Sequence, residues 1–392
     1  MAWPSRIDAC RPALPAYHLR MDDTPQTTPL PREASLDVAT LELLRRMPKA
    51  ELHLHLDGSL RPRTALELAL ERGLADGLDE AAMRARLQAP MPCVDQAELL
   101  RAFALPVALL QDAEALARST HELVVDVASD GTTYAEIRWA PTLHLERGLS
   151  LRDGIAAVVG GARSGAAATG ISVRLIAVAL RTHTPELAEE MARTAVTFLP
   201  DGLTGFDCAG QERQEPDPQR FQAAYAVARG AGLGITCHAG EWGGAAQVRR
   251  ALLLHPSRIA HGAPAAEDPA LVAELRARGV SLDLCPTSNY QAGMVLSLDA
   301  HPLARLHRAG APVTLSTDDR TVSDLTLVRE YARAVALLQL SLPELWAIDR
   351  HALEVAFLHH DEALRGRLLA EFDAFAASEP RLRGPSEVRG PA

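Results

Sequence analysis

Short apolar runs alternate along most of the chain with segments of helical periodicity. The runs that have the length and apolar character of buried strands are residues 51–56, 132–140, 171–180, 202–209, 233–239, 258–262, 279–286 and 311–317. Two of the intervening segments end at Gly131 and Gly279, and glycine is a common residue at the end of a helix. Eight strands that alternate with helices predict an α/β protein, a (β/α)8 TIM barrel with a closed parallel sheet inside a ring of helices.

The domain organisation follows from the places where this alternation stops. The longest interruption, residues 61–130, has room for two or three extra helices, and a final helical stretch at 343–377 should pack outside the barrel. The Pro-rich segment 1–35 lacks the apolar core of a signal peptide. We therefore expect a disordered extension at 1–35, a single barrel domain at 36–378 and a disordered tail at 379–392.

Polar side chains fall at the ends of the predicted strands. His53 and His55 lie two residues apart, which places both imidazoles on one face of the first strand. His238, His261 and Asp318 lie at the ends of the fifth, sixth and eighth strands. Because barrel active sites form where the carboxyl ends of the strands converge, we expect these residues to meet at one mouth. Imidazoles and a carboxylate together predict a metal site of the Zn²⁺ type.

Each of these residues also has a structural interpretation. His53 and His55 taken alone are equally consistent with hydrogen-bonded core histidines, and only the whole set favours a metal. Glu241 is either a carboxylate at the N-cap or in the first turn of a helix, favoured by the helix dipole, or a proton shuttle near the metal. Asp318 and Asp319 form either an ordinary turn or a pair in which one carboxylate meets the metal and the other meets a substrate.

Composition and charge exclude several classes of partner. The net charge is −10 and no dense Lys/Arg run is present, whereas a nucleic-acid binder needs a basic face. No apolar run is long enough to span a bilayer, so neither nucleic acid nor a membrane is a predicted partner. The five cysteines are widely spaced without a Cys-x-x-Cys pair, which predicts a reducing, cytoplasmic location. Cys285 is expected to be a small buried hydrophobic residue and not a ligand.

Several motifs also match a known family. They are "KAELHLHLDGSL" (49–60), "YAEIRWAP" (134–141), "GFDCAGQE" (205–212), "HAGE" (238–241), "RIAHG" (258–262), "CPTSNYQAG" (285–293) and "STDD" (316–319). In this order and spacing they resemble the adenosine deaminase family of metal-dependent amidohydrolases, over about residues 45 to 375. The segment 103–116 is similar to the helical lid of that family.

The resemblance implies a role for each matching residue. One zinc ion per chain would be held by the metal ligands His53, His55, His238 and Asp318. Around a purine ring, the matching residues are Glu241 at N1, His261 beside the attacking water, Asp319 at N7, the Gly210 N–H at N3 and Asp57 at a ribose hydroxyl. The catalytic residues implied are Glu241, His261 and Asp318, and those that bind substrate are Asp57, Gly210 and Asp319.

The reaction implied is hydrolysis of the 6-amino group of a small purine nucleoside. Adenosine or 2′-deoxyadenosine would give the inosine product and ammonia. Zinc lowers the pKa of a bound water to about 7, which supplies a nucleophile at neutral pH. Glu241 can donate a proton to N1 only if burial and neighbouring carboxylates raise its pKa.

Two departures from the family pattern and several alternatives bear on the substrate. Arg320 stands where the family often has proline, and Ala260 stands where the family often has glycine. Arg320 is expected near the mouth of the barrel, where it would influence the substrate.

Asp57 suits a neutral hydroxyl group of the substrate and would repel a 5′-phosphate. A 5′-modified adenosine such as 6-aminodeoxyfutalosine, or adenine, remains an alternative substrate. Hydrolysis of an amide or ester, and a non-catalytic metal-binding barrel, are more distant alternatives.

Overall fold

Eight parallel strands form the centre of the molecule, in sequence order around the sheet. The computed structural model describes residues 36–75, 77–213 and 217–383. The strands are β1 Lys49–His55, β2 Thr132–Trp139, β3 Ser172–Leu180, β4 Leu203–Ala209, β5 Gly234–Ala239, β6 Arg258–His261, β7 Ser281–Leu284 and β8 Val313–Leu315. Each lies within or next to one of the eight predicted runs, and the predicted TIM barrel is confirmed.

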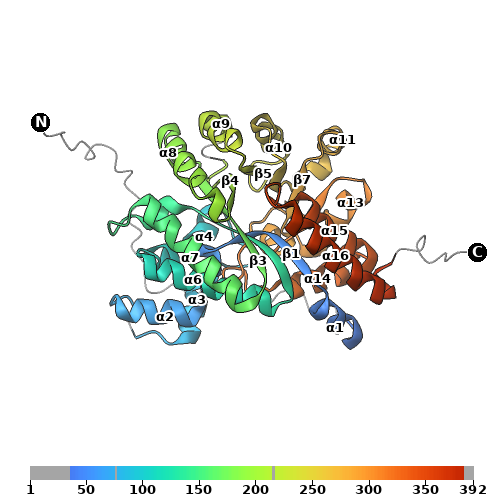
Figure 1. Ribbon diagram of the computed structural model, residues 1–392. Helices are drawn as coiled ribbons and strands as arrows, with labels where there is room; N and C mark the ends of the chain where they lie inside the picture. Colours follow the sequence, from blue (N-terminus) through green and yellow to red (C-terminus); the bar gives the residue numbers. More distant parts are fainter. Residues whose placement is uncertain (1–35, 76, 214–216, 384–392) are drawn as a thin grey trace, which may run out of the picture.

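Helices surround the sheet on its outer side (Figure 1). They are α1 Val38–Arg46, α2 Pro62–Glu71, α3 Glu80–Leu87, α4 Gln96–Arg101, α5 Ala104–Leu109, α6 Ala113–Ser129, α7 Leu151–Thr169, α8 Pro185–Val196, α9 Gln222–Gly230, α10 Ala245–Ala251, α11 Pro269–Arg278, α12 Pro286–Gln291, α13 Leu303–Arg308, α14 Leu327–Ala336, α15 Leu342–Val355 and α16 Glu362–Ser378. Gly279 ends α11 in the left-handed conformation, with φ of 64°, as its position in the sequence predicts. No described helix has both the length and the apolar character of a membrane span.

The barrel is closed by contacts between its first and last strands. Leu54 and Asp318 form a parallel bridge. Its two hydrogen bonds run from Asp318 N to His53 O (3.0 Å) and from His55 N to Asp318 O (2.7 Å). The end of β1, with His53 and His55, and the segment after β8, with Asp318, therefore lie side by side at the carboxyl ends of the strands.

The segments between the predicted strands differ from expectation in number and length. Residues 61–130 hold five helices, α2 to α6, instead of two or three. Helices α4 and α5 have six residues each, which is too short to show a clear period in the sequence. Leu99 of α4 belongs to a small apolar cluster with Cys93, Ala102, Ala292 and Val322.

The C-terminal part of the chain is ordered beyond the predicted boundary. The stretch 343–377 contains two helices, α15 and α16. After them, Pro380–Leu382 forms a short 3-10 helix, and Leu382 is buried. The start of the predicted disordered tail at 379 is therefore wrong by several residues. The predictions for 1–35 and for 384–392 fall outside the described residues.

Candidate active site

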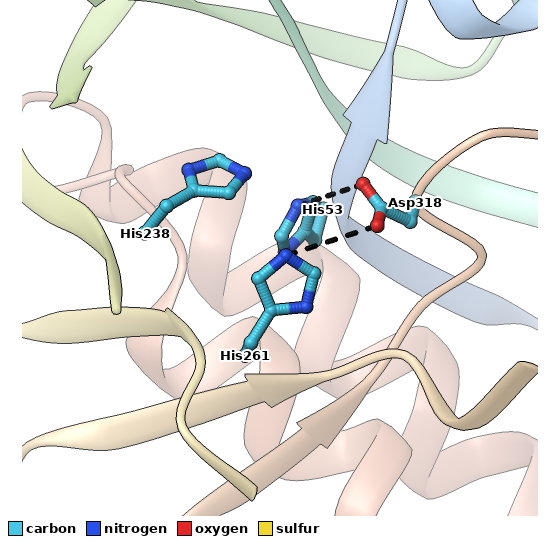
Figure 2. Close-up of side chains that lie close together, drawn as sticks. All are labelled: His53, His238, His261 and Asp318. Carbon is cyan, nitrogen blue, oxygen red and sulfur yellow. Dashed lines mark ion pairs between the residues drawn. The ribbon is translucent and has the colours of Figure 1, made fainter. Parts of the chain in front are cut away.

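Four side chains from different strand ends converge at the carboxyl end of the barrel. His53 comes from β1, His238 from β5, His261 from β6, and Asp318 from the segment after β8. One possible ligand atom from each lies within 4.8 Å of the others, and all four residues are buried. Figure 2 shows the imidazoles and the carboxylate turned toward a common centre. The convergence that the strand-end pattern predicts is present.

His55, the other histidine of the β1 pair, lies at the edge of this group. Its Nε2 is 3.2 Å from Nε2 of His238 and 3.3 Å from Oδ1 of Asp318. The same carboxylate oxygen is 3.0 Å from Nε2 of His53. Asp318 thus faces both histidines of the pair, as a shared ligand set requires.

The ionisation of these groups suits a cation. Burial lowers the pKa of His53 well below 6.5 and that of His55 to about 3, so both imidazoles keep a free nitrogen lone pair at neutral pH. Burial alone would raise the pKa of Asp318, but His53 and the other histidines outweigh it and hold that pKa well below 3.8. Neutral imidazoles beside an ionised carboxylate are a donor set that fits Zn²⁺.

Two of the converging residues have unusual backbone conformations. His261 has φ of 69° and Asp318 has φ of 68°, in the left-handed region that residues with a Cβ seldom occupy. Such conformations cost of order 1–3 kcal/mol and persist where the surrounding structure imposes them. Here they aim the imidazole and the carboxylate into the centre of the site.

Residues around the cluster hold its members in place, and sequence reasoning assigned them no role. Asp207 Oδ2 lies 2.9 Å from Nδ1 of His238 and accepts a hydrogen bond from Arg138 Nη1 (2.8 Å). Ser288 Oγ donates to Asp318 Oδ2 (2.6 Å). Asp207, Arg138 and Ser288 all lie within the family motifs quoted above. Their presence in those motifs was the sequence signal that could have pointed to a role in the site.

Two further polar residues stand behind His261. Asn289 Nδ2 lies 3.0 Å from Nδ1 of His261, and Asn289 Oδ1 lies 3.0 Å from Nε2 of His301. All three side chains are buried. Asn289 belongs to the "CPTSN" motif, whereas His301 lies in a connection that carries no motif, and nothing in the sequence pointed to it.

Glu241 faces the cluster from the loop that follows β5. The next helix, α10, begins at Ala245 and has Gly244 as its N-cap, so the alternative of an N-cap or first-turn helix carboxylate is wrong. Its Oε2 lies 3.9 Å from Nε2 of His261. Burial, and then the charges of Asp318 and Glu212, raise the pKa of Glu241 well above 4.5. These surroundings favour the protonated form of Glu241.

The loop that bears Glu241 is held by another buried carboxylate, which sequence reasoning also missed. Glu212 accepts hydrogen bonds from the backbone N–H groups of Gly240, Trp242 and Gly243, each at 2.6 Å. Three backbone donors on one side chain fix the loop on both sides of Glu241.

Asp57 and Asp319 lie beside the cluster and carry unusual charge states. Burial raises the pKa of Asp57 to about 6; burial, Asp318 and Asp57 raise that of Asp319 well above 3.8. The Oδ1 atoms of both are buried without a hydrogen-bond partner in the described structure. A Cβ on Gly58 would lie 1.7 Å from Asp319 Oδ1, so glycine is required there. Both oxygens can therefore accept or donate a hydrogen bond to a bound molecule.

Gly210 directly follows β4 and has φ of 102°, a conformation that favours glycine. The side chain of Arg320 does not line the mouth of the barrel, contrary to the expectation that it would influence the substrate. Its guanidinium pairs with Glu51 (Nη1 to Oε2, 3.5 Å) and Asp130 (Nη2 to Oδ2, 3.2 Å). Glu51 lies near the start of β1, and Asp130 lies between α6 and β2, so Arg320 contributes to packing of the barrel. Ala260 is a buried residue of β6.

A family model described as adenosine deaminase matches residues 48–374. The chain belongs to the adenosine deaminase family. An adenosine deaminase from Enterococcus faecalis is 36% identical over 319 residues, which cover 81% of this chain and 94% of that protein. Membership of this family identifies the chain as a hydrolytic deaminase and removes the alternative of a non-catalytic barrel.

Solved structures of the same fold agree with this assignment. An amidohydrolase from Burkholderia ambifaria, solved with bound zinc, aligns with a TM-score of 0.79 at 27% identity and covers 91% of this chain and 99% of that one. The N6-methyl-AMP deaminase of Arabidopsis thaliana aligns with a TM-score of 0.76 at 31% identity, over 86% of this chain and 100% of that one. The adenosine deaminase fold is thus shared with enzymes that differ in their named substrates.

Proposed function

We propose that this enzyme hydrolyses the 6-amino group of a purine nucleoside, converting adenosine or 2′-deoxyadenosine to the inosine product and ammonia. The observation that carries the proposal is the placement of Glu241, with its raised pKa, next to His261 and the buried histidine–aspartate cluster. A proton donor beside a site that fits a metal is what hydrolysis of an aromatic amine needs.

One zinc ion per chain is the proposed cofactor, held by His53, His55, His238 and Asp318. The donor set fits zinc, and a structural relative was solved with zinc. When bound, zinc would acidify a water molecule and so supply the nucleophile. Asp207 would support His238 from behind, and Ser288 would do the same for Asp318, as outer partners commonly do for metal ligands.

The residues of the chain would prepare the purine for attack. Glu241 would donate its proton to N1, which makes C6 more electrophilic and keeps charge from building on the ring. Asp319, whose pKa is raised, would hydrogen-bond N7, and the Gly210 N–H would meet N3. His261 would contact the attacking oxygen. One proton of the attacking water would pass to the 6-amino group, the C6–N bond would break and ammonia would leave as the C6 carbonyl forms. The other proton of the water would replace the one that Glu241 gave to N1.

The carboxylates also bear on the choice of substrate. Asp57 would accept a hydrogen bond from a ribose hydroxyl, and its negative charge above a pKa of about 6 opposes a 5′-phosphate. The Arabidopsis relative is named for a nucleotide substrate, so this residue is the proposed point of difference. A 5′-modified adenosine such as 6-aminodeoxyfutalosine, or adenine, is the competing substrate.

Ammonia release from a panel of substrates tests the proposal. The panel is adenosine, 2′-deoxyadenosine, adenine, AMP, N6-methyl-AMP and 6-aminodeoxyfutalosine, each with the zinc-loaded enzyme. We expect the highest kcat/KM with adenosine or 2′-deoxyadenosine and little turnover of the two nucleotides. A preference for AMP would contradict the role of Asp57, and no turnover of any member would contradict the proposed function.

A further inference from the structure

A buried chain of hydrogen bonds runs from the start of α13 to His261. The backbone N–H of Leu303 donates to Nδ1 of His301 (3.2 Å). Nε2 of His301 lies 3.0 Å from Oδ1 of Asn289, and Nδ2 of Asn289 lies 3.0 Å from Nδ1 of His261. Asn289 and His261 are essentially inaccessible to solvent, and His301 is 4% exposed.

The first group of this chain fixes the direction of every bond that follows. A backbone N–H can only donate, so Nδ1 of His301 must accept. In a neutral imidazole the other nitrogen then carries the hydrogen, and Nε2 of His301 donates to the Asn289 carbonyl oxygen. The Asn289 amide is thereby oriented with its NH2 group toward His261. Nδ1 of His261 must accept in turn.

A charged His301 would break this order. Its Nδ1 would then carry a hydrogen that points at the Leu303 N–H, and two donors would face each other at 3.2 Å. Burial independently lowers the pKa of His301 to about 3. Both the geometry and the environment therefore keep His301 neutral.

We infer that Asn289 and His301 are positioning residues that hold neutral His261 as the tautomer with hydrogen on Nε2. The nitrogen that faces the site is then a donor. The surroundings of Nε2 suit a donor, because an oxygen of the ionised Asp318 carboxylate lies 3.8 Å away and a carboxyl oxygen of Glu241 lies 3.9 Å away. His301 itself does not contact the cluster and acts only through Asn289.

This inference deepens the proposed function and, for its catalytic consequence, rests on it. A neutral His261 with hydrogen on Nε2 donates a hydrogen bond to the attacking oxygen and stabilises the negative charge that develops there. It does not offer a lone pair on that side to take up the proton of the water. Of the two roles open to a histidine beside the attacking water, the hydrogen-bond network selects the donor.

The tautomer can be measured without any assay of activity. The full-length, zinc-loaded protein with ¹⁵N-labelled histidines would be studied by long-range ¹H–¹⁵N correlation spectroscopy, which distinguishes the two neutral tautomers. His261→Gln identifies the His261 signals. We expect the pattern of a protonated Nε2. Protonated Nδ1 in the wild-type protein would overturn the inference.

Substitutions at the two positioning residues test the cause. Asn289→Asp replaces the donor by an acceptor and should shift the hydrogen of His261 to Nδ1, with kcat reduced about 10²-fold and KM unchanged. His301→Leu frees the Asn289 amide to rotate and should give mixed tautomers, whereas His301→Gln keeps an acceptor and a donor and should restore the wild-type pattern. Unchanged His261 signals in both Asn289→Asp and His301→Leu would overturn the inference.

A matched control separates this effect from general damage to the helix. Thr287 lies on the same helix α12, is fully buried, and its backbone N–H donates to Glu330 (2.8 Å) while its hydroxyl accepts from Arg333 Nη1 (2.8 Å). Thr287→Val removes the hydroxyl and should leave the His261 signals unchanged. Because the spectra do not depend on turnover, an inactive protein with the expected tautomer would contradict the proposed function and not this inference.

Discussion

Asp207 holds His238 from the side that faces away from the other histidines. Its Oδ2 lies 2.9 Å from Nδ1 of His238, while Nε2 of His238 faces Nε2 of His55 at 3.2 Å. Burial alone would raise the pKa of Asp207, but His238 and Arg138 hold it below 3.8. The carboxylate is therefore ionised and fixes hydrogen on Nδ1, which leaves Nε2 free for a metal.

Asp207→Asn should weaken zinc binding about 10–100-fold, because outer partners of metal-binding histidines contribute effects of this size. His238→Ala, which removes the proposed ligand itself, should abolish stoichiometric zinc. Competition with a zinc-binding dye and elemental analysis measure the two effects. Asp201→Asn, at an exposed carboxylate that pairs with Arg163, should leave zinc affinity unchanged. A wild-type zinc affinity in Asp207→Asn would contradict the proposed support of His238 by Asp207.

Glu241→Gln should retain zinc and lose about 10²–10⁴-fold in kcat, the usual contribution of a general acid or base. The amide keeps the shape of the side chain but has no proton to give to N1. Steady-state kinetics with adenosine, together with zinc content, measure both expectations. A rate above about a tenth of wild type would be incompatible with proton donation by Glu241.

Asp57→Asn should reduce kcat/KM for adenosine by about 10–100-fold, which corresponds to loss of a hydrogen bond of about 1.5–3 kcal/mol to a charged group. It should also reduce discrimination against AMP, since the repulsion between two negative groups is removed. The ratio of kcat/KM for adenosine to that for AMP is the quantity to compare. An unchanged ratio would show that Asp57 does not select the substrate.

Arg320→Ala should lower the free energy of unfolding by about 3–5 kcal/mol, because it leaves a buried carboxylate without its partner. Glu51 is fully buried, and Arg320 is only 9% exposed at its side chain. Urea denaturation followed by circular dichroism measures the change. Arg84→Ala removes an exposed pair with Asp324 (3.4 Å) and should cost at most about 1 kcal/mol. Equal effects of the two substitutions would contradict a packing role for Arg320.

The sequence predicted those parts of the molecule that repeat with a clear period or combine in a motif. The eight strands followed from their apolar runs, and the convergence of His53, His238, His261 and Asp318 followed from their places at strand ends. These predictions needed only the geometry of a closed parallel sheet. The six-residue helices α4 and α5 were missed because fewer than two turns carry no measurable period.

The supporting residues of the site were missed for a different reason. Hydrogen bonds connect Leu303 to His301 and His301 to Asn289. No periodicity or motif in the sequence relates His301 to Asn289. Glu212 lies in the motif "GFDCAGQE", but its role becomes clear only from the three backbone N–H groups that donate to its carboxylate. Arg320 was expected at the mouth from its neighbours in sequence, whereas its long side chain reaches Glu51 and Asp130. Side-chain direction, which decides such contacts, is not encoded in residue spacing.

The bridge between Leu54 and Asp318 has a consequence for how the enzyme is made. Leu52 and Ser316, which hydrogen-bond beside this bridge, are 264 positions apart in the chain. During synthesis, the histidines of β1 leave the ribosome long before Asp318, which completes the proposed ligand set. Metal capture by the complete site must therefore follow translation of nearly the whole chain. An ion bound by the proposed ligands would link the first and last strands, so loss of metal should loosen these two strands before the others.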